Sequence, residues 1–322
     1  MEKGRSVKAP AFHAGFARSG AAGTGQIPAA AKGRPIVMSH PTYPDRGGQG
    51  TCRRMEPAFP PHHQNRQPGA EYHMDPLPAA KGPCVRGGGK LKGKTALITG
   101  GDSAIGRAVA YAFAKEGANV AISCFGGERD ARETQAHIEA LGVPCILLPA
   151  DLRDRRGAKR IVKETVELFG QIDVLVNNHG IQFVCENILA ITPDQLENTV
   201  DPNVCGFFYV IEEALPDIPQ GGAIIHAVSA TACQGSGKLL DSSATRAAIV
   251  SLTRSLAQSL AGRKIRVNAV APGPAWAPFQ PTASPAGQPL EMVQSCLYLA
   301  CDDSAGITGQ VLQIDGGSCG YS

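Results

Sequence analysis

From residue 91 onward, short apolar segments alternate with segments of helical periodicity. The apolar segments lack a polar residue at every second position, so they are typical of strands buried on both faces. Such strands, each followed by a helix, form a parallel sheet covered by helices on both faces. The expected strands cover residues 94–100, 119–124, 145–148, 172–176, 223–228, 265–270 and 311–314. The main expected helices cover residues 105–113, 128–141, 158–169, 195–215, 249–260 and 292–299. The sequence therefore predicts an α/β fold.

The first 90 residues differ in composition from the rest. They hold 14 Gly and 12 Pro, with 13 Lys and Arg against 5 Asp and Glu. Such segments are typically disordered, and dispersed charges with few aromatics favour a solvated arm over a nucleic-acid or membrane partner. No apolar h-region follows Met1, so a secretory signal is not expected, and Gly and Pro interrupt any amphipathic transit helix. Whether Met55 is the true start stays open.

Composition excludes several classes of protein. With 43% hydrophobic residues the chain can bury a large core, and no window approaches the ~18 uninterrupted apolar residues of a membrane-spanning helix. The ten cysteines are scattered without a CxxC pair, so neither a disulfide scaffold nor a metal site is expected. Cysteines inside apolar segments, such as Cys145, are typical of small buried residues in a reducing compartment, which favours a cytoplasmic protein.

A glycine-rich turn joins the first expected strand to the first expected helix, Thr99-Gly-Gly-Asp-Ser-Ala-Ile-Gly106. Such a turn lets backbone N–H groups approach a pyrophosphate where the helix dipole favours negative charge. A purely structural turn is the alternative, but a position at the start of a strand–helix–strand series favours dinucleotide binding. Asp151, after the third strand, is placed to meet an adenine edge. Asn177 and Asn178 end the fourth strand beside the same groove.

Together these motifs resemble the short-chain dehydrogenase/reductase family, and within it the glucose/ribitol-dehydrogenase-like or aldehyde-reductase-like branch. The similar segments include Asp151-Leu-Arg-Asp154, Gly170-Gln-Ile-Asp-Val-Leu-Val-Asn-Asn178, Ala271-Pro-Gly-Pro274, Ile307-Thr-Gly-Gln310 and Asp315-Gly-Gly317. The Pro-rich segment 60–78 resembles the N-terminal arm of that branch. We therefore expect a disordered basic extension at 1–57, an arm at 58–90 and a dinucleotide-binding domain at 91–322.

The resemblance implies a single doubly wound Rossmann domain with seven parallel strands, and a homo-oligomer, either a tetramer or a dimer. It implies NAD or NADP, and the choice stays open because Ser123-Cys124-Phe125 offers neither a ribose-binding acid nor a phosphate-binding Arg. Arg107 is a possible phosphate partner, although a surface position is favoured. The residues expected at the cofactor are Thr99, Gly100, Gly101, Ser103, Ile105, Gly106, Asp151, Leu152, Asn178, Gly180, Arg246, Pro272 and Gly273.

The resemblance also implies alcohol–carbonyl interconversion, in which a Tyr moves the proton and a Lys four residues later holds the nicotinamide ribose and lowers the Tyr pKa. Ser229 matches the family's Ser that polarises the substrate oxygen, and Asn203 matches the Asn that anchors a relay water. Counting from Ser229 gives Ser242 at the Tyr position and Arg246 at the Lys position. A serine hydroxyl is shorter and far less acidic than a phenol, whose pKa is about 10. We therefore expect the activity to be absent or very weak.

Other departures from the family fall at the same site. Ala104 replaces the middle glycine of the turn, His179 replaces a small residue, and Ala277 replaces a Thr. The stretch from Pro278 to Gln288 is shorter than the family's substrate lid. His179 is the one candidate for a surrogate acid, although a tolerated histidine is the simpler interpretation.

His226 is expected to be a packed, hydrogen-bonded histidine, and Trp276 and Phe279 are expected to line a hydrophobic wall. Two functions stay open. One is a weak NAD(P)-dependent oxidoreductase for a small alcohol, aldehyde or sugar, with Ser242 and water relaying the proton and Arg246 at the ribose. The other is a pseudoenzyme that binds a dinucleotide or assembles with an intact relative. A decayed gene whose product folds poorly is a third possibility.

Overall fold

The computed structural model describes residues 60, 64, 67–81, 87–278 and 287–316. The predicted extension at 1–57 and the side chain of Phe279 lie outside these described residues. Among the helices of the described part, none has both the length and the apolar composition needed to cross a bilayer.

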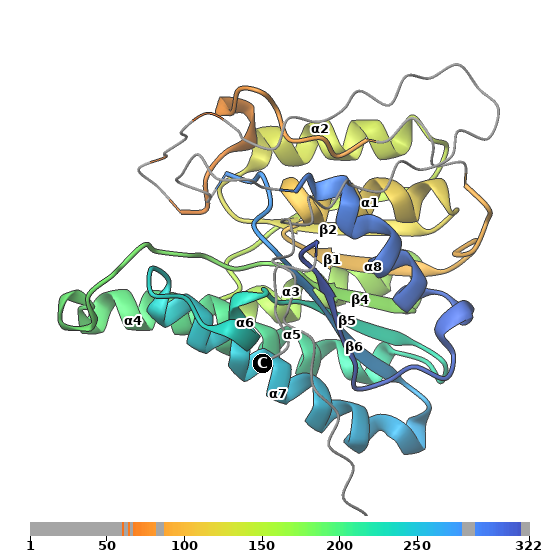
Figure 1. The fold of residues 1–322 in the computed structure, drawn as a ribbon. Coiled ribbons are helices and arrows are strands. Elements are labelled where there is room, and N and C mark those ends of the chain that lie inside the picture. Colours follow the sequence, from red (N-terminus) through yellow and green to blue (C-terminus); the bar gives the residue numbers. More distant parts are fainter. Residues whose placement is uncertain (1–59, 61–63, 65–66, 82–86, 279–286, 317–322) are drawn as a thin grey trace, which may run out of the picture. The chain divides into compact units, whose positions relative to one another are not determined.

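Seven parallel strands form one sheet in the order β3-β2-β1-β4-β5-β6-β7 (Figure 1). The strands are β1 (Thr95–Thr99), β2 (Asn119–Cys124), β3 (Cys145–Pro149), β4 (Val174–Asn177), β5 (Ala223–Ala227), β6 (Arg266–Pro272) and β7 (Val311–Ile314). In register, Ile98 pairs with Ile122 on one side and Val176 on the other. The predicted doubly wound Rossmann sheet is thus confirmed. Because the chain leaves β1 in one direction and later resumes at β4 on its other side, the switch point lies between β1 and β4.

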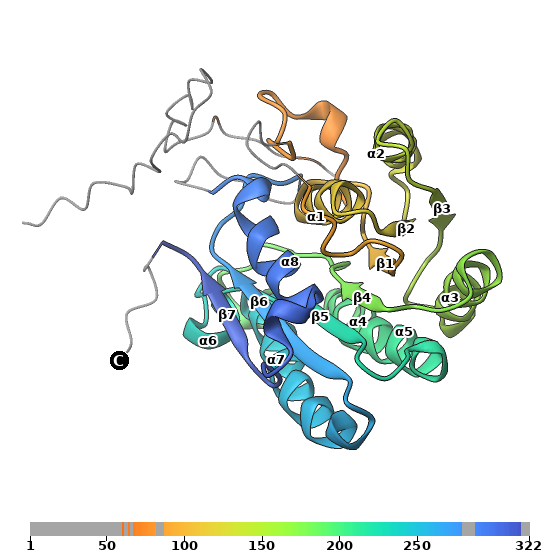
Figure 2. The same cartoon turned by 90° about the vertical axis from the view of Figure 1, so that its right-hand side faces the viewer.

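Helices cover both faces of the sheet, with α1, α2 and α8 on one face and α3, α5 and α7 on the other (Figure 2). The helices are α1 (Ala104–Lys115), α2 (Glu128–Glu139), α3 (Arg155–Phe169), α4 (Pro193–Val200), α5 (Gly206–Ala214), α6 (Thr231–Gln234), α7 (Leu240–Leu260) and α8 (Val293–Ala300). Successive strand residues point to opposite faces. Ile98 therefore joins the core that includes Phe113 of α1, whereas Leu97 joins the core that includes Phe207 of α5.

The prediction that residues 195–215 are helical is confirmed, but the helix is not a regular α-helix throughout. Helix α4 ends at Val200, a π-helical turn spans Asp201–Cys205, and α5 begins at Gly206. Pro202 lies inside this turn and has no N–H to donate, so the regular hydrogen-bond ladder cannot continue through it. The wider turn leaves Asn203 fully buried.

An N-terminal arm, residues 67–81, packs beside α1 and α2, as both views show (Figures 1 and 2). Trp276 is fully buried, shares a small core with Met74 of the arm, and donates its Nε1–H to Pro76 O at 2.7 Å. Trp276 was predicted to line a wall of the groove, and this was wrong. The indole instead holds the arm, because a buried indole N–H requires an acceptor, which the arm supplies.

Candidate cofactor and active site

A cavity of about 330 Å³ runs along the carboxyl ends of the strands. Its wall includes Gly100 after β1, Phe125 after β2, Asn178 after β4, Ser229 after β5 and Gly273 after β6. The cavity therefore extends across the switch point between β1 and β4, where open α/β sheets bind their ligands. Its extended course along the strand ends fits an elongated ligand such as a dinucleotide.

The glycine-rich turn is built from close backbone contacts. Gly100 has φ of +61°, a conformation that favours glycine, and its carbonyl accepts a 3.0 Å hydrogen bond from Asn178 Nδ2. A Cβ on Gly106 would lie 1.9 Å from Gly100 O, so a larger residue does not fit there. The first amide of α1, that of Ala104, donates to Glu71 Oε2 at 2.6 Å. Because the first amides of a helix have no acceptor within it, those that follow Ala104 in the first turn can be offered to a phosphate.

Ten of the predicted cofactor residues line this cavity. They are Gly100, Ser103, Ile105, Asp151, Leu152, Asn178, Gly180, Arg246, Pro272 and Gly273. Thr99, Gly101 and Gly106 lie behind the turn instead. Thr99 is fully buried and accepts a 2.9 Å bond from Asn178 N, and a Cβ on Gly101 would lie 2.6 Å from a methyl carbon of Ile122. These three residues hold the turn against the sheet.

An ion pair occupies the wall at the β2 and β3 end of the cavity. Arg153 Nη2 donates to Asp151 Oδ2 at 2.6 Å, and this hydrogen bond lowers the pKa of Asp151. The same guanidinium lies 5.3 Å from the ring centre of Phe125. An adenine at Asp151 would share that carboxylate with Arg153. Sequence reasoning missed Arg153 and Phe125, although each stands within two residues of an expected strand-end position.

Ser229, Ser242 and Arg246 line the opposite end of the cavity, so the structure brings together three of the predicted catalytic residues. Ser242 lies in the first turn of α7, and Arg246 follows one turn later on the same helix face. Ser229 Oγ accepts hydrogen bonds from Thr231 Oγ1 at 3.0 Å and from its backbone N at 3.2 Å. The spacing that aligned these residues in the sequence is therefore matched by their arrangement in space.

Asn203 does not line the cavity. Its Oδ1 accepts from Ile181 N at 2.8 Å, and its Nδ2 donates to Ile181 O at 2.9 Å and to Thr245 Oγ1 at 3.1 Å. Asn203 thus clamps the loop after β4 to α7. Ile181 itself lines the cavity, so Asn203 acts on the cavity through the backbone it holds.

The guanidinium of Arg246 is held without a carboxylate partner among the described residues. Its Nη1 donates to Ala227 O at 3.0 Å, and its Cζ lies 5.9 Å from the ring centre of Phe207. Burial lowers the pKa of Arg246 to about 10, which leaves it charged at neutral pH. A Cβ on Gly180 would lie 2.1 Å from Nη2, so glycine at this position gives the guanidinium its room.

Both histidines near the site are neutral and packed. Burial lowers the pKa of each of His179 and His226 to about 3. His179 Nδ1 lies 2.7 Å from Thr99 Oγ1, and a Cβ on Gly206 would lie 2.8 Å from its buried Nε2. His179 lines the cavity, but its Nδ1 is engaged with Thr99 and its Nε2 is buried, so the geometry does not favour it as a surrogate acid. His226 Nδ1 lies 2.9 Å from Thr253 Oγ1, which confirms the prediction of a hydrogen-bonded histidine.

Arg107 is neither a surface residue nor a wall of the cavity, so both sequence interpretations were wrong. Its side chain is 6% exposed, and Nη1 lies 2.8 Å from Glu71 Oε1 while Nη2 lies 3.4 Å from Asp130 Oδ1. Its Nε donates to Asp102 O at 2.9 Å. A guanidinium can be buried here because carboxylates from two other segments compensate its charge.

The arm contributes wall residues that sequence reasoning did not assign. Gln67, Pro68 and Gly69 line the cavity beside Ser103 and Ala104 of the turn. The only sign of this in the sequence is the resemblance of the Pro-rich segment to the arm of related proteins, because the segment has no periodicity that would predict where it packs.

Comparisons with known proteins agree with this geometry. Residues 100–319 match the model of a family described as Enoyl-(Acyl carrier protein) reductase. The chain is 46% identical over 272 residues to an uncharacterized oxidoreductase, YhdF, of Bacillus subtilis (strain 168), covering 80% of this chain and 94% of that protein. It is 41% identical over 277 residues to the chloroplastic NADPH-dependent aldehyde reductase 1 of Arabidopsis thaliana, covering 79% and 96%.

Among solved structures, a blue fluorescent protein from a metagenomic library in complex with NADPH superposes with a TM-score of 0.69 and 30% identity, covering 72% of this chain and all of that one. The family match covers strands β2 to β7 with their helices, most of the glycine-rich turn and the segment with Ser229, Ser242 and Arg246. The chain belongs to the short-chain dehydrogenase/reductase family of NAD(P)-dependent oxidoreductases.

Proposed function

We propose that the protein binds NAD(P) along this cavity and interconverts a small alcohol or sugar hydroxyl with an aldehyde or ketone, with impaired proton transfer. The observation that carries the proposal is the shared cavity, in which the glycine-rich turn and Ser229 meet Ser242 and Arg246. The substrate class is supported by the similarity to an aldehyde reductase.

Different residues along the cavity would hold different parts of the cofactor. The first-turn amides of α1 that follow Ala104 would hold the pyrophosphate, and Leu152 and Phe125 would bracket the adenine. Arg246 would reach the nicotinamide ribose from the opposite wall. A bound nicotinamide supplies or accepts the hydride, whereas the proton has to be moved by groups of this chain and water.

Ser242 limits that proton transfer. Its side chain is 3% exposed and lines the cavity, but the hydroxyl is short and far less acidic than a phenol. A water has to bridge Ser242 to the substrate oxygen, which Ser229 polarises. Loss of a positioned acid or base typically lowers the rate by roughly 10²–10⁴-fold. Arg246 keeps the positive charge of the family's Lys, although its planar guanidinium is bulkier than the ammonium group of Lys.

The second candidate is a dinucleotide-binding protein without turnover, because the replaced residues are those that move the proton. For either function we propose a homo-oligomer in a reducing, cytoplasmic compartment. Support for assembly comes from the exposed side chains Leu196 of α4 and Phe208 of α5, with exposed fractions of 46% and 49%. Support for the compartment comes from the absence of disulfides among the described cysteines.

A cofactor titration tests the proposal. NADPH and NADH are added to the purified protein, and nucleotide fluorescence and the shift in Tm are followed together, with a panel of small aldehydes then offered to the complex. We expect binding of at least one nucleotide and slow, Ser229-dependent oxidation of it. Binding without turnover supports the second candidate, and no shift with either nucleotide at millimolar concentration overturns both.

A further inference from the structure

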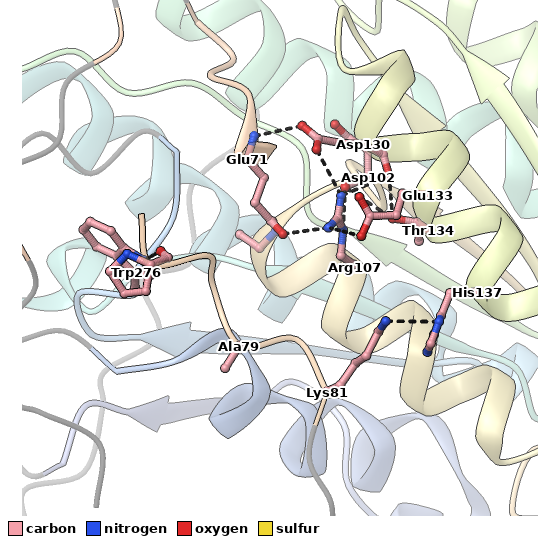
Figure 3. A network of polar contacts seen from close by, with 12 residues as sticks. Glu71, Ala79, Lys81, Asp102, Arg107, Asp130, Glu133, Thr134, His137 and Trp276 are labelled. Atoms are coloured by element: carbon pink, nitrogen blue, oxygen red, sulfur yellow. Dashed lines mark hydrogen bonds and ion pairs between the residues drawn. The ribbon is translucent and has the colours of Figure 1, made fainter. Parts of the chain in front are cut away.

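The arm places Glu71 in a network of polar contacts with Arg107 and Asp130 (Figure 3). Glu71 Oε2 accepts a 2.6 Å hydrogen bond from Ala104 N, and Oε1 lies 2.8 Å from Arg107 Nη1. The backbone N–H of Glu71 donates to Asp130 Oδ2 at 2.8 Å. Glu71 is 1% exposed, so these contacts are made away from water, where a charge-assisted hydrogen bond is strong.

The amide that Glu71 holds is that of Ala104, whose backbone conformation is disfavoured by its Cβ. Ala104 has φ of +44°, and only Lys264 shares a positive φ among the described non-glycine residues. A Cβ crowds the backbone in this region, whereas glycine adopts it freely. Ala104 therefore needs an outside contact to stay in the shape that the turn requires.

Glu71 supports the turn from behind. Ser103, Ala104 and Ile105 line the cavity, as do the arm residues before Glu71, but Glu71 itself does not. Its charge is paired with Arg107, so the carboxylate neither occupies the phosphate position nor presents an uncompensated negative charge to it.

We propose that Glu71 is a positioning residue for the cofactor, holding the Ala104 amide so that the turn keeps its pyrophosphate-binding shape. The inference rests on the proposed binding of NAD(P). It makes the arm part of the cofactor site, although the arm precedes the first strand by more than ten residues. Arm docking and cofactor binding are then linked, and each favours the other.

The arm has anchors that do not involve Glu71. Trp276 Nε1 donates to Pro76 O, and Gln288 Oε1 accepts from Ala79 N at 2.7 Å. Replacement of Glu71 is therefore expected to leave the arm docked. Trp276 is the only tryptophan of the chain, so its emission wavelength reports whether the arm stays in place.

A double-mutant cycle tests the inference. The full chain is prepared as wild type, Glu71→Gln, Ala104→Gly and the double variant, and NADPH and NADH affinities are measured by fluorescence titration. We expect Glu71→Gln to weaken binding about 10-fold in the Ala104 background but less than about 3-fold in the Ala104→Gly background, because glycine needs no support. The matched control Lys81→Gln removes another arm contact, to His137 Nδ1 at 3.0 Å, and is expected to leave affinity unchanged.

A second readout needs no cofactor. Glu71→Gln is expected to lower the Tm more in the Ala104 background than in the Ala104→Gly background, with unchanged Trp276 emission. Equal losses of affinity and Tm in the two backgrounds, or tighter NADPH binding by Glu71→Gln, would overturn the positioning role while leaving the proposed function intact. Failure of the wild type to bind either nucleotide, by contrast, overturns the proposed function itself.

Discussion

Asp102 is a buried acid that has no cation bound directly to its carboxylate in the described structure. It is 7% exposed, and burial raises its pKa from 3.8 to about 7, with the negative charge of Asp130 adding to the shift. Arg107, which pairs with Glu71 and Asp130, offsets only part of this effect. Replacement by Asn keeps the shape of the side chain and removes its titration.

The sign and size of the expected effect follow from the two pKa values. Between pH 4 and pH 7 the native protein keeps a proton on Asp102 that the unfolded chain releases, so the native state binds more protons and its stability falls as the pH rises. Burial of Asp102 therefore lowers the free energy of unfolding by about 2 kcal/mol at pH 5 and by about 4 kcal/mol at pH 8. These values use ~1.4 kcal/mol for each pH unit over which only the unfolded chain has released the proton. The gain in stability from Asp102→Asn should therefore grow by about 2–3 kcal/mol between these pH values.

Urea unfolding of wild type and Asp102→Asn at pH 5 and pH 8 measures this difference. Comparing the two proteins is essential, because His179 and His226 change stability in the opposite direction over part of the range and cancel only in the difference. A variant whose stability relative to wild type is the same at both pH values would refute the account of Asp102 as a buried, largely protonated acid.

Three further substitutions probe other parts of the account. Trp276→Phe removes the hydrogen bond to Pro76, which should cost about 1 kcal/mol and make the arm easier to cleave in limited proteolysis; unchanged cleavage would contradict the anchoring role. Gly180→Ala forces a Cβ against the guanidinium of Arg246 and should weaken NADPH binding at least ~10-fold in a titration, whereas unaltered affinity would show that Arg246 does not hold the cofactor. His226 stays neutral in the native protein, so its contribution to stability should fall by about 2 kcal/mol from pH 7 to pH 5, and urea unfolding of His226→Gln should lack that fall.

The fold could be predicted because its signals are local. Each strand reads as an apolar segment and each helix as a periodic one, and the sheet follows from their alternation. The irregularity inside one helix was not predicted. The segment 195–215 has helical periodicity throughout, but Pro202 interrupts the ladder and produces the π-helical turn.

The candidate site was predictable to the extent that it depends on strand ends and helix spacing. Ser242 and Arg246 lie one turn apart on α7 and both line the cavity. Counting along the sequence was therefore enough to predict that they lie together. The environment of Arg107 was not predictable, because its partner Glu71 comes from a Pro-rich segment without periodicity. Thr99 belongs to the glycine-rich motif but does not line the cavity, and instead accepts a bond from Asn178 N. The motif alone therefore does not tell which of its residues face the cofactor and which support the turn.

We propose that the protein binds NADPH in this cavity and that its proton-transfer step is impaired. The most direct test is the single-turnover rate of NADPH oxidation by a saturating small aldehyde, measured for wild type and for Ser242→Tyr/Arg246→Lys. We expect similar NADPH affinity for the two proteins and a rate at least ~100-fold higher in the restored variant. A wild type that turns over as fast as the restored variant, with both binding NADPH, would contradict the proposal.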